Sequence, residues 1–343
     1  MVSLHSIYFR YHIDAYFLEA EIIQSMKVCD HIKKANGKTL LSFEVLPPLK
    51  GGRMKDIFDT LDPLMEYKPS FIDVTYHRED IVFNKRESGY YEKMSIRKRP
   101  GTVGICASLM HKYHVDTVPH LICGGFTIAE TEDALIDLAF LGIDNVLALR
   151  GDARNMDSRF IPEPGGHKYA VDLVHQLQHM NNGEYLDQNL ANAAPTEFCV
   201  GVAGYPEKHF EAPNFDIDLK FLKDKVDAGA DYIVTQMFFD NKKYFDFVDK
   251  CHAVGIDVPI IPGLKPMTRK SQLTSIPRMF YIDFPDEFAN EMAAAKDREA
   301  AKIIGIEWCI QQSKELKENG APILHYYTMG DTKTMLRILK EVV

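Results

Sequence analysis

One unit recurs along this 343-residue chain: an apolar, β-branched run that ends in polar residues, a loop, a helical pattern, and a glycine before the next run. Eight such runs occur, at residues 39–45, 70–76, 118–123, 145–150, 198–203, 232–237, 258–262 and 323–327. The runs are almost continuously hydrophobic, which is typical of parallel strands buried on both faces. Eight strands that alternate with helices predict an α/β protein with a (β/α)8 TIM barrel, and a doubly wound open sheet is the alternative.

The segments between the runs carry helix signals at both ends. Helices are predicted at 127–142, 215–228, 241–254 and 297–319, the first of them opening on a capping box formed by Thr127 and Glu130. A glycine stands where each helix needs a left-handed cap, at Gly142, Gly229, Gly255 and Gly320. The stretches 153–166 and 181–196, rich in Pro and Gly or in Asn, are predicted to be long loops.

Composition narrows the class of protein. The net charge of −9, from 40 basic and 49 acidic residues, argues against nucleic-acid and anionic-membrane partners. No stretch approaches the roughly 18 uninterrupted apolar residues of a membrane span. The six scattered cysteines form no C-x-x-C pair, which favours reduced, mostly buried thiols in a cytoplasmic protein. We expect one catalytic domain over residues 26–343, and an extension of doubtful order, outside the native protein if translation starts at Met26, over residues 1–25.

Polar residues gather where the predicted strands end, the edge at which (β/α)8 barrels carry their chemistry. Glu44 ends the first run and is followed by apolar residues, so its carboxyl should be desolvated and hold a proton near neutrality. Asp152 follows Arg150 in a tight glycine turn and is expected to stay ionised. Each alone could simply cap a helix. Their convergence on one rim favours a catalytic site.

Several familiar motifs are missing from the sequence. It contains neither G-x-x-x-x-G-K-[ST] nor G-x-G-x-x-G, so the standard glycine-rich phosphate loops are absent. It contains no G-x-S-x-G elbow of a serine hydrolase. The histidine pairs His111/His114 and His175/His179 are interpreted as surface residues rather than zinc ligands, so no metal site is expected.

At these strand ends the sequence resembles the 5,10-methylenetetrahydrofolate reductase family. The motifs occur in one order, at residues 42–48 (SFEVLPP), 74–76 (VTY), 120–123 (HLIC), 147–152 (LALRGD), 204–209 (GYPEKH), 225–230 (KVDAGA), 235–240 (TQMFFD) and 261–263 (IPG). The resemblance covers about residues 38–343. Any one motif is weak, but the ordered set is specific.

The resemblance implies a barrel that holds FAD at its C-terminal rim. NADH or NADPH would reduce the flavin and leave, and methylenetetrahydrofolate would then take a hydride from flavin N5 in a ping-pong reaction that gives 5-methyltetrahydrofolate. Glu44 matches the general acid, and Asp152 matches the carboxylate beside the flavin. Gln236 and Gln272 match substrate-binding residues, as does Glu44. The implied cofactor-binding residues are Thr75, Tyr76, His120, Arg150, Gly151, Asp152, Tyr169, Ala170, Tyr205, His209, Asp218 and Lys225.

The sequence departs from the family pattern at a few positions. Phe221 and Asp224 stand where relatives often carry Asn and Arg, and Ile276 stands about where an aromatic residue can stack on the substrate. His77 replaces a common Gly, and Ile122 replaces a common Thr. These changes bear on the contacts to the cofactors. From the resemblance we expect the protein to lack the C-terminal regulatory domain of longer relatives and to form a homo-oligomer.

Two other functions remain open on the sequence alone. One is an aldolase or lyase without flavin that uses Glu44 together with Lys265 as a Schiff-base lysine. The other is a non-catalytic barrel that binds a pterin or a flavin, which the presence of Glu44, Asp152 and Gln236 argues against. The choice between NADH and NADPH is not decided by any residue of the sequence.

Overall fold

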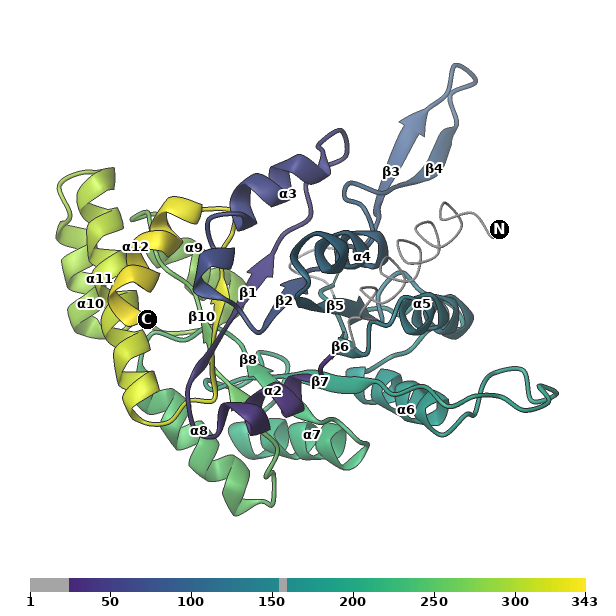
Figure 1. Cartoon of the computed structure of the whole chain (residues 1–343). Coiled ribbons are helices and arrows are strands. Elements are labelled where there is room, and N and C mark those ends of the chain that lie inside the picture. Colours follow the sequence, from purple (N-terminus) through teal and green to yellow (C-terminus); the bar gives the residue numbers. More distant parts are fainter. Residues whose placement is uncertain (1–24, 154–158) are drawn as a thin grey trace, which may run out of the picture.

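The computed structural model describes residues 25–153 and 159–343, so the extension expected at residues 1–25 lies almost wholly outside the described residues. Eight parallel strand positions form a barrel with helices around it (Figure 1). The barrel strands are β1 (Leu40–Val45), β2 (Phe71–Val74), β5 (Asp116–Ile122), β6 (Asn145–Leu149), β7 (Cys199–Gly204), β8 (Tyr232–Thr235), β9 (Ile260–Ile261) with β10 (Gly263–Leu264), and β11 (Ile323–Tyr327). The prediction of a (β/α)8 barrel is confirmed, and the open sheet is excluded.

The seventh strand is interrupted, which its hydrophobic run did not predict. It was expected at 258–262, but it runs to Leu264 and is divided into β9 and β10 by Pro262. Proline has no N–H to donate to a neighbouring strand, so the ladder is interrupted there. β9 pairs with β8, β10 pairs with β11, and β11 pairs with β1. The interrupted strand therefore closes the ring.

Helices follow the strands around the ring. They are α2 (Val28–Ala35), α3 (Met54–Leu61), α4 (Thr102–Tyr113), α5 (Ile128–Phe140), α6 (Ala170–Asn181), α7 (Phe215–Asp227), α8 (Asn241–Ala253), α9 (Gln272–Phe280), α10 (Asp286–Ala294), α11 (Arg298–Glu318) and α12 (Thr332–Val342), with a short 3₁₀ turn at Met65–Tyr67. The four predicted helices are confirmed to within two residues at each end. The capping box is present, because Thr127 Oγ1 accepts a hydrogen bond from the Glu130 N–H at 3.1 Å.

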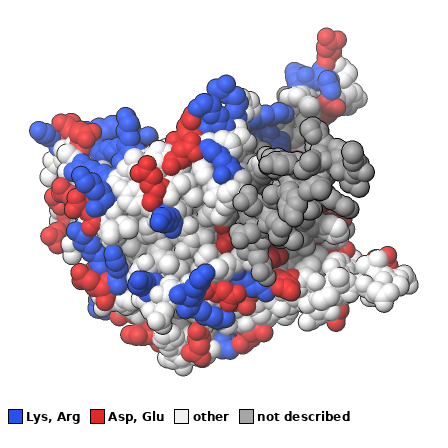
Figure 2. Space-filling view, viewed as in Figure 1, with Lys and Arg blue, Asp and Glu red and all other residues white. Residues whose placement is uncertain are grey.

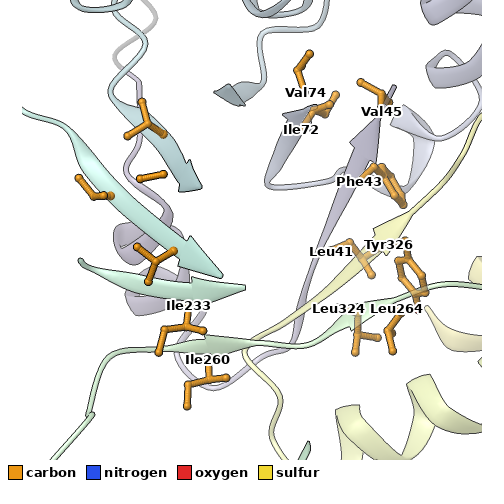
Figure 3. Packing of buried hydrophobic residues seen from close by; sticks show 14 of the residues in the cluster. Leu41, Phe43, Val45, Ile72, Val74, Ile233, Ile260, Leu264, Leu324 and Tyr326 are labelled. Carbon is orange, nitrogen blue, oxygen red and sulfur yellow. The ribbon is translucent and has the colours of Figure 1, made fainter. Parts of the chain in front are cut away.

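Two apolar cores follow from the alternation of side chains along each strand. Side chains such as Phe43, Ile72 and Tyr326 face outward and pack against the helices (Figure 3). The alternate positions face inward, and at the N-terminal end of the barrel they form a smaller cluster that includes Phe71 and Tyr232. Both strand faces are thus buried, as the continuous hydrophobic runs predicted.

Helix α2 covers the N-terminal end of the barrel. Val28 belongs to the interior cluster, and its N–H donates to Asn145 Oδ1 at 2.8 Å. The Asn145 side-chain amide in turn donates to the Met26 carbonyl at 3.0 Å. Because this end is closed, the opposite rim is the one open to ligands.

A hairpin that the hydrophobic runs do not predict lies between β2 and α4. Its strands β3 (Asp80–Lys85) and β4 (Tyr91–Ile96) project from the barrel (Figure 1), and among the described residues they pair only with each other. Most of its residues are exposed, including Tyr90 and Tyr91, so it lacks an apolar periodicity.

Acidic and basic side chains are interspersed over the described part of the face shown in Figure 2.

The loops and cysteines agree with the sequence. Residues 182–198 contain no helix or strand, as predicted for 181–196. The loop expected at 153–166 is irregular over residues 159–166, and residues 154–158 lie outside the described residues. All six cysteines are free thiols, and all except Cys29 are buried.

Candidate active site

Glu44 lies at the C-terminal end of β1 and faces the barrel interior. Its side chain is 15% exposed, and its Oε2 lies 3.7 Å from His120 Nε2. Burial raises the pKa of Glu44 to about 7, an increase to which the nearby Asp73 adds and which His120 and Lys265 oppose. A carboxyl with this pKa carries a proton through much of the neutral range, as its place in the sequence suggested.

Beside Glu44, at the paired position of the neighbouring strand β2, lies a second carboxyl that the sequence did not single out. Asp73 is buried in β2, with Oδ1 3.4 Å from His120 Nε2 and Oδ2 3.7 Å from His325 Nδ1. Burial raises the pKa of Asp73 to about 7. The same His325 nitrogen lies 2.8 Å from the Ser42 hydroxyl. Two carboxyls and two imidazoles therefore meet inside the barrel.

Two glycines leave room for bulky side chains in the barrel interior. A Cβ atom on Gly201 would lie 2.4 Å from the Tyr232 ring, and one on Gly263 would lie 2.3 Å from the Tyr327 hydroxyl. That hydroxyl donates to the Thr235 carbonyl at 2.7 Å. These strand positions admit no larger residue unless the aromatic side chains move.

A cavity of about 610 Å³ opens beside His120 at the rim. Its walls come from the loop after β1, from the start of α4, and from Tyr76, Ile122 and Phe126. The rings of Tyr76 and Phe126 lie 5.1 Å apart. The size and the aromatic lining are typical of a pocket for a planar organic ligand.

Basic side chains gather where β6 and β7 end. Arg150 forms an ion pair with Glu211, and its guanidinium lies 5.1 Å from the centre of the Phe160 ring. Lys225 donates to the carbonyl of Ala203, and burial lowers the pKa of Lys225 to about 8. Burial, with Arg150 next in importance, also lowers the pKa of His209 to about 4. The three residues lie close together, because Arg150 and Lys225 both act electrostatically on His209.

Asp218 and Tyr205 lie beside these basic residues, both in contact with His209. The Asp218 carboxylate accepts a hydrogen bond from the His209 N–H at 2.9 Å, and the Tyr205 and His209 rings lie 4.7 Å apart. Burial raises the pKa of Tyr205 above its ordinary range, with smaller contributions from Asp218 and Asp152.

Gly151 and Asp152 follow β6 directly. Gly151 has a φ of +81°, and a Cβ atom there would lie 3.2 Å from Ile122, so a side chain at this turn would be both strained and crowded. The Asp152 side chain is exposed at the rim and acts electrostatically on both His77 and Tyr205. It therefore lies between the cavity side and the basic side of the rim.

The remaining cofactor positions flank these groups. Thr75 follows β2 and donates its N–H to the Val45 carbonyl at 3.1 Å. Tyr169 is the N-cap of α6 and Ala170 its first residue, and the Tyr169 carbonyl lies 3.5 Å from the Cys123 sulfur at the end of β5. Both therefore lie at the same rim of the barrel.

The two glutamines differ in how closely they join the site. Gln236 follows β8, where its N–H donates to the Gly204 carbonyl and its Oε1 accepts from the Met237 N–H. Gln272 begins α9, and its Oε1 accepts from the N–H groups of Thr268 and Arg269 at 2.8 and 2.9 Å. Within residues 25–153 and 159–343, no hydrogen bond joins Gln272 to the other candidate residues. Ile276 is buried among apolar residues of the same region.

Neither a metal cluster nor a membrane span accompanies this site. Among the residues that the structure describes, no three His, Cys, Asp or Glu side chains are grouped so as to hold a metal ion. In the same part of the chain, no helix is long and apolar enough to cross a membrane.

The fold and the rim together define a class of protein: a (β/α)8 barrel with a buried proton-holding carboxyl beside a pocket for a planar ligand and a basic rim suited to an anion. Comparison with known proteins makes this specific. Residues 27–343 match the family model described as methylenetetrahydrofolate reductase. The chain belongs to this family.

The sequences of individual relatives support this family membership. The chain is 32% identical over 329 residues to methylenetetrahydrofolate reductase (NADH) 1 of Arabidopsis thaliana, in an alignment that covers 92% of this chain and 51% of the plant protein. It is 30% identical over 302 residues to 5,10-methylenetetrahydrofolate reductase of Pectobacterium carotovorum, covering 87% and 88% of the two chains. The chain thus spans about half the length of the plant relative and most of the bacterial one.

A solved structure supports the fold. It is an uncharacterized protein from Clostridium thermocellum that binds two copies of 5-methyl-5,6,7,8-tetrahydrofolic acid, with a TM-score of 0.53 and 14% sequence identity. The match covers 90% of this chain and 99% of the other. At this identity the likeness concerns the barrel alone.

Proposed function

We propose that this protein reduces 5,10-methylenetetrahydrofolate to 5-methyltetrahydrofolate, with FAD as its cofactor and NADH or NADPH as the electron donor. The observation that carries the proposal is the buried Glu44, whose pKa of about 7 suits a proton donor at the rim of the barrel. Family membership and the names of the relatives support the substrate class.

The residues present fit a flavin dinucleotide. The cavity beside His120 is large enough for a planar ring system, and Tyr76 with Phe126 offers aromatic faces. Arg150 and Lys225 would meet the negative charge of a diphosphate on the other side of Asp152. The glycine at position 151 lets the backbone approach a ligand closely. A bound flavin would supply the hydride chemistry, in which electrons arrive from NAD(P)H and leave to the folate carbon.

The protein's own side chains would donate the proton and stabilise the positive charge. Glu44 would give its proton to the folate nitrogen released when the five-membered ring opens, which leaves a cationic methylene-iminium group. Asp152, exposed at the rim, would stabilise that positive charge through its carboxylate. Gln236 would orient the pterin from the end of β8, and Gln272 could join it only if its amide turns from the loop that it caps. Nicotinamide and folate would use the same face in turn, so the kinetics should be ping-pong.

A spectroscopic experiment tests this function. The purified protein, incubated with FAD and passed through a desalting column, should retain a yellow flavin whose absorption bleaches on anaerobic addition of NADH or NADPH. Methylenetetrahydrofolate should then restore the oxidised spectrum. A protein that takes up no FAD would contradict the proposal. So would a protein whose reduced flavin is not reoxidised by methylenetetrahydrofolate.

The lyase hypothesis rests on one specific observation. Lys265 follows β10, is partly buried, and acts electrostatically on Glu44, and burial lowers its pKa. Such a lysine suits Schiff-base formation with a carbonyl substrate. Borohydride trapping of a carbonyl compound on Lys265 in the flavin-free protein would favour this function, whereas retained flavin and an unmodified Lys265 favour the reductase.

A further inference from the structure

The buried polar side chains inside the barrel share a geometry that the proposed function does not use. His120 Nε2 lies 3.4 Å from Asp73 Oδ1 and 3.7 Å from Glu44 Oε2, so one nitrogen faces two carboxyls. Asp73 and His120 are each 5% exposed or less, Glu44 has the most exposed side chain of the three, and His120 lines the cavity. A proton on Glu44 can therefore also be held by a buried neighbour, by way of His120.

Two orphaned atoms mark the inner end of this cluster. Asp73 Oδ2 and His325 Nε2 are buried and have no hydrogen-bond partner within the described part of the chain. A fully ionised, unpaired carboxylate at such a position would be costly, whereas a carboxyl that holds a proton part of the time is not. The barrel interior therefore disfavours charge on both acids at once.

We infer that Asp73 is a positioning residue that shares one proton with Glu44 through Nε2 of His120. The inference rests on the proposed role of Glu44 as the proton donor to the folate. In the resting site the proton is held by the pair, and His120 lies between the two acids. Two carboxyls joined in this way titrate together, like other closely placed acids that cannot both ionise.

The proton movements balance over one turnover. The O–H bond of Glu44 breaks as the folate nitrogen gains the proton. When the shared proton lies on Asp73, it reaches Glu44 beforehand: the O–H bond of Asp73 breaks as an N–H bond forms at His120 Nε2, and that N–H bond breaks as the O–H bond of Glu44 forms. After the transfer to the folate both acids are carboxylates, which the interior disfavours, so one solvent proton enters at Glu44 once the product has left and restores the shared proton. No electrons move in these steps.

The charged and titratable groups that face the pair come from several elements. Glu44 is faced by His120 of β5, by Asp73 of β2, by Lys265 after β10 and by Tyr327 of β11. Asp73 is faced by His120 and His325, with Cys106 of α4 and Tyr232 of β8 further off. Of these, Asp73 is the acid that acts on Glu44, and its negative charge raises the pKa of Glu44.

The Asp73→Asn variant tests the shared proton, because the amide keeps the shape and cannot donate the proton. The rate of flavin reoxidation by methylenetetrahydrofolate should fall with rising pH as Glu44 ionises. Without Asp73, the pKa of Glu44 falls, so this decline should move down by about one pH unit, and the rate at pH 8 should drop roughly tenfold. Flavin reduction by NADH should be unaffected.

Two comparisons separate this role from a merely structural one. Thr117→Val is the matched control, because Thr117 is as buried as Asp73 and lies on the same strand as His120, yet its neighbour is Cys106 of α4. It should leave the pH at which the rate declines unchanged. Asp73→Ser, a second neutral replacement in case Asp73→Asn does not fold, should give the same downward shift. A slower Asp73 variant with an unshifted decline would overturn the inference.

A measurement without turnover keeps the inference independent of the proposed function. In protein labelled with ¹³C at histidine Cε1, the His120 signal, assigned by its loss in His120→Gln, should respond to the ionisation of the pair. Its inflection should move to lower pH in Asp73→Asn and stay in place in Thr117→Val. If wild-type protein fails to reduce the folate, the proposed function fails, and this inflection still decides the shared proton. An inflection that is the same in wild type and Asp73→Asn would refute it.

Discussion

Replacing Glu44 by Gln should remove catalysis of the folate reaction and at the same time stabilise the folded protein. Gln has the shape of the protonated carboxyl but no proton to give. General acids contribute on the order of 10²- to 10⁴-fold to rate, so we expect a loss of that size in flavin reoxidation by the folate. Flavin binding and flavin reduction by NADH do not need this proton and should persist.

The stability effect has a definite sign and pH window. The pKa of Glu44 is raised from 4.5 to about 7 by burial, so the folded protein holds a proton that the unfolded chain has lost. Below pH 4.5 both states are protonated, and the wild type suffers no penalty from this group. Between pH 4.5 and about 7 the wild type loses stability, up to about 3 kcal/mol. Gln does not ionise, so the Glu44→Gln variant does not lose this stability as the pH rises.

Thermal unfolding of the ligand-free proteins measures this difference. With an unfolding entropy of about 2.1 cal/mol/K per residue, 3 kcal/mol corresponds to a rise in Tm of about 4 °C for a chain of 343 residues. The rise should be present at pH 8 and absent at pH 4.5. Glu318→Gln, on the exposed last turn of α11, is the matched control and should change Tm at neither pH. A Glu44→Gln protein that is no more stable at pH 8 would refute the reasoning from burial.

Three further substitutions test other parts of the site and the barrel. Asp152→Asn should retain flavin and slow the folate half-reaction about 10- to 100-fold, and an equal slowing of NADH oxidation in stopped-flow measurements would contradict its assigned role. Arg150→Ala should weaken FAD binding about tenfold or more in a fluorescence titration, since a hydrogen bond to a charged group contributes about 1.5–3 kcal/mol, whereas Lys340→Ala on α12 should not. Gly201→Ala should destabilise the protein by about 1–3 kcal/mol in urea, because its Cβ would lie 2.4 Å from the Tyr232 ring. Gly104→Ala on α4, whose Cβ would meet no atom of the described residues within 4 Å, should stabilise it by up to about 1 kcal/mol, and equal effects would contradict the packing argument.

The barrel could be predicted because its strands are buried on both faces. That burial makes each strand a continuous apolar run, and the helix caps then mark the segments between the runs, as Thr127 does for α5. The hairpin β3–β4 escaped prediction for the opposite reason. Its residues join none of the apolar clusters of the described residues, so they show no alternation, and the pairing of the two backbones defines the hairpin. The break at Pro262 follows from a missing N–H, which a hydrophobic run does not reveal.

The rim residues could be predicted because the polar ends of parallel strands meet at one edge. Glu44, Arg150 and His209 are visible in the sequence for this reason. Asp73 is different, since it stands within the run 70–76, between Ile72 and Val74, rather than at its polar end. A single acid within an apolar strand is the signal that could have identified it, because such a residue faces inward when its neighbours face the helices. Its partners on β5 and β11 are known only once the strands are in register.

Because the barrel interior is partly polar, most of the apolar packing lies between the strands and the surrounding helices. Where (β/α)8 barrels commonly fill their interior with branched apolar side chains, this barrel places Asp73, His120 and His325. These groups contribute little hydrophobic stabilisation, and burial of the two acids opposes folding at neutral pH. The stabilising contacts therefore lie in the outward layer between strands and helices and in the small cluster closed by α2. Substitutions in the outward layer should thus affect folding first, and substitutions in the inward polar layer should affect proton transfer first.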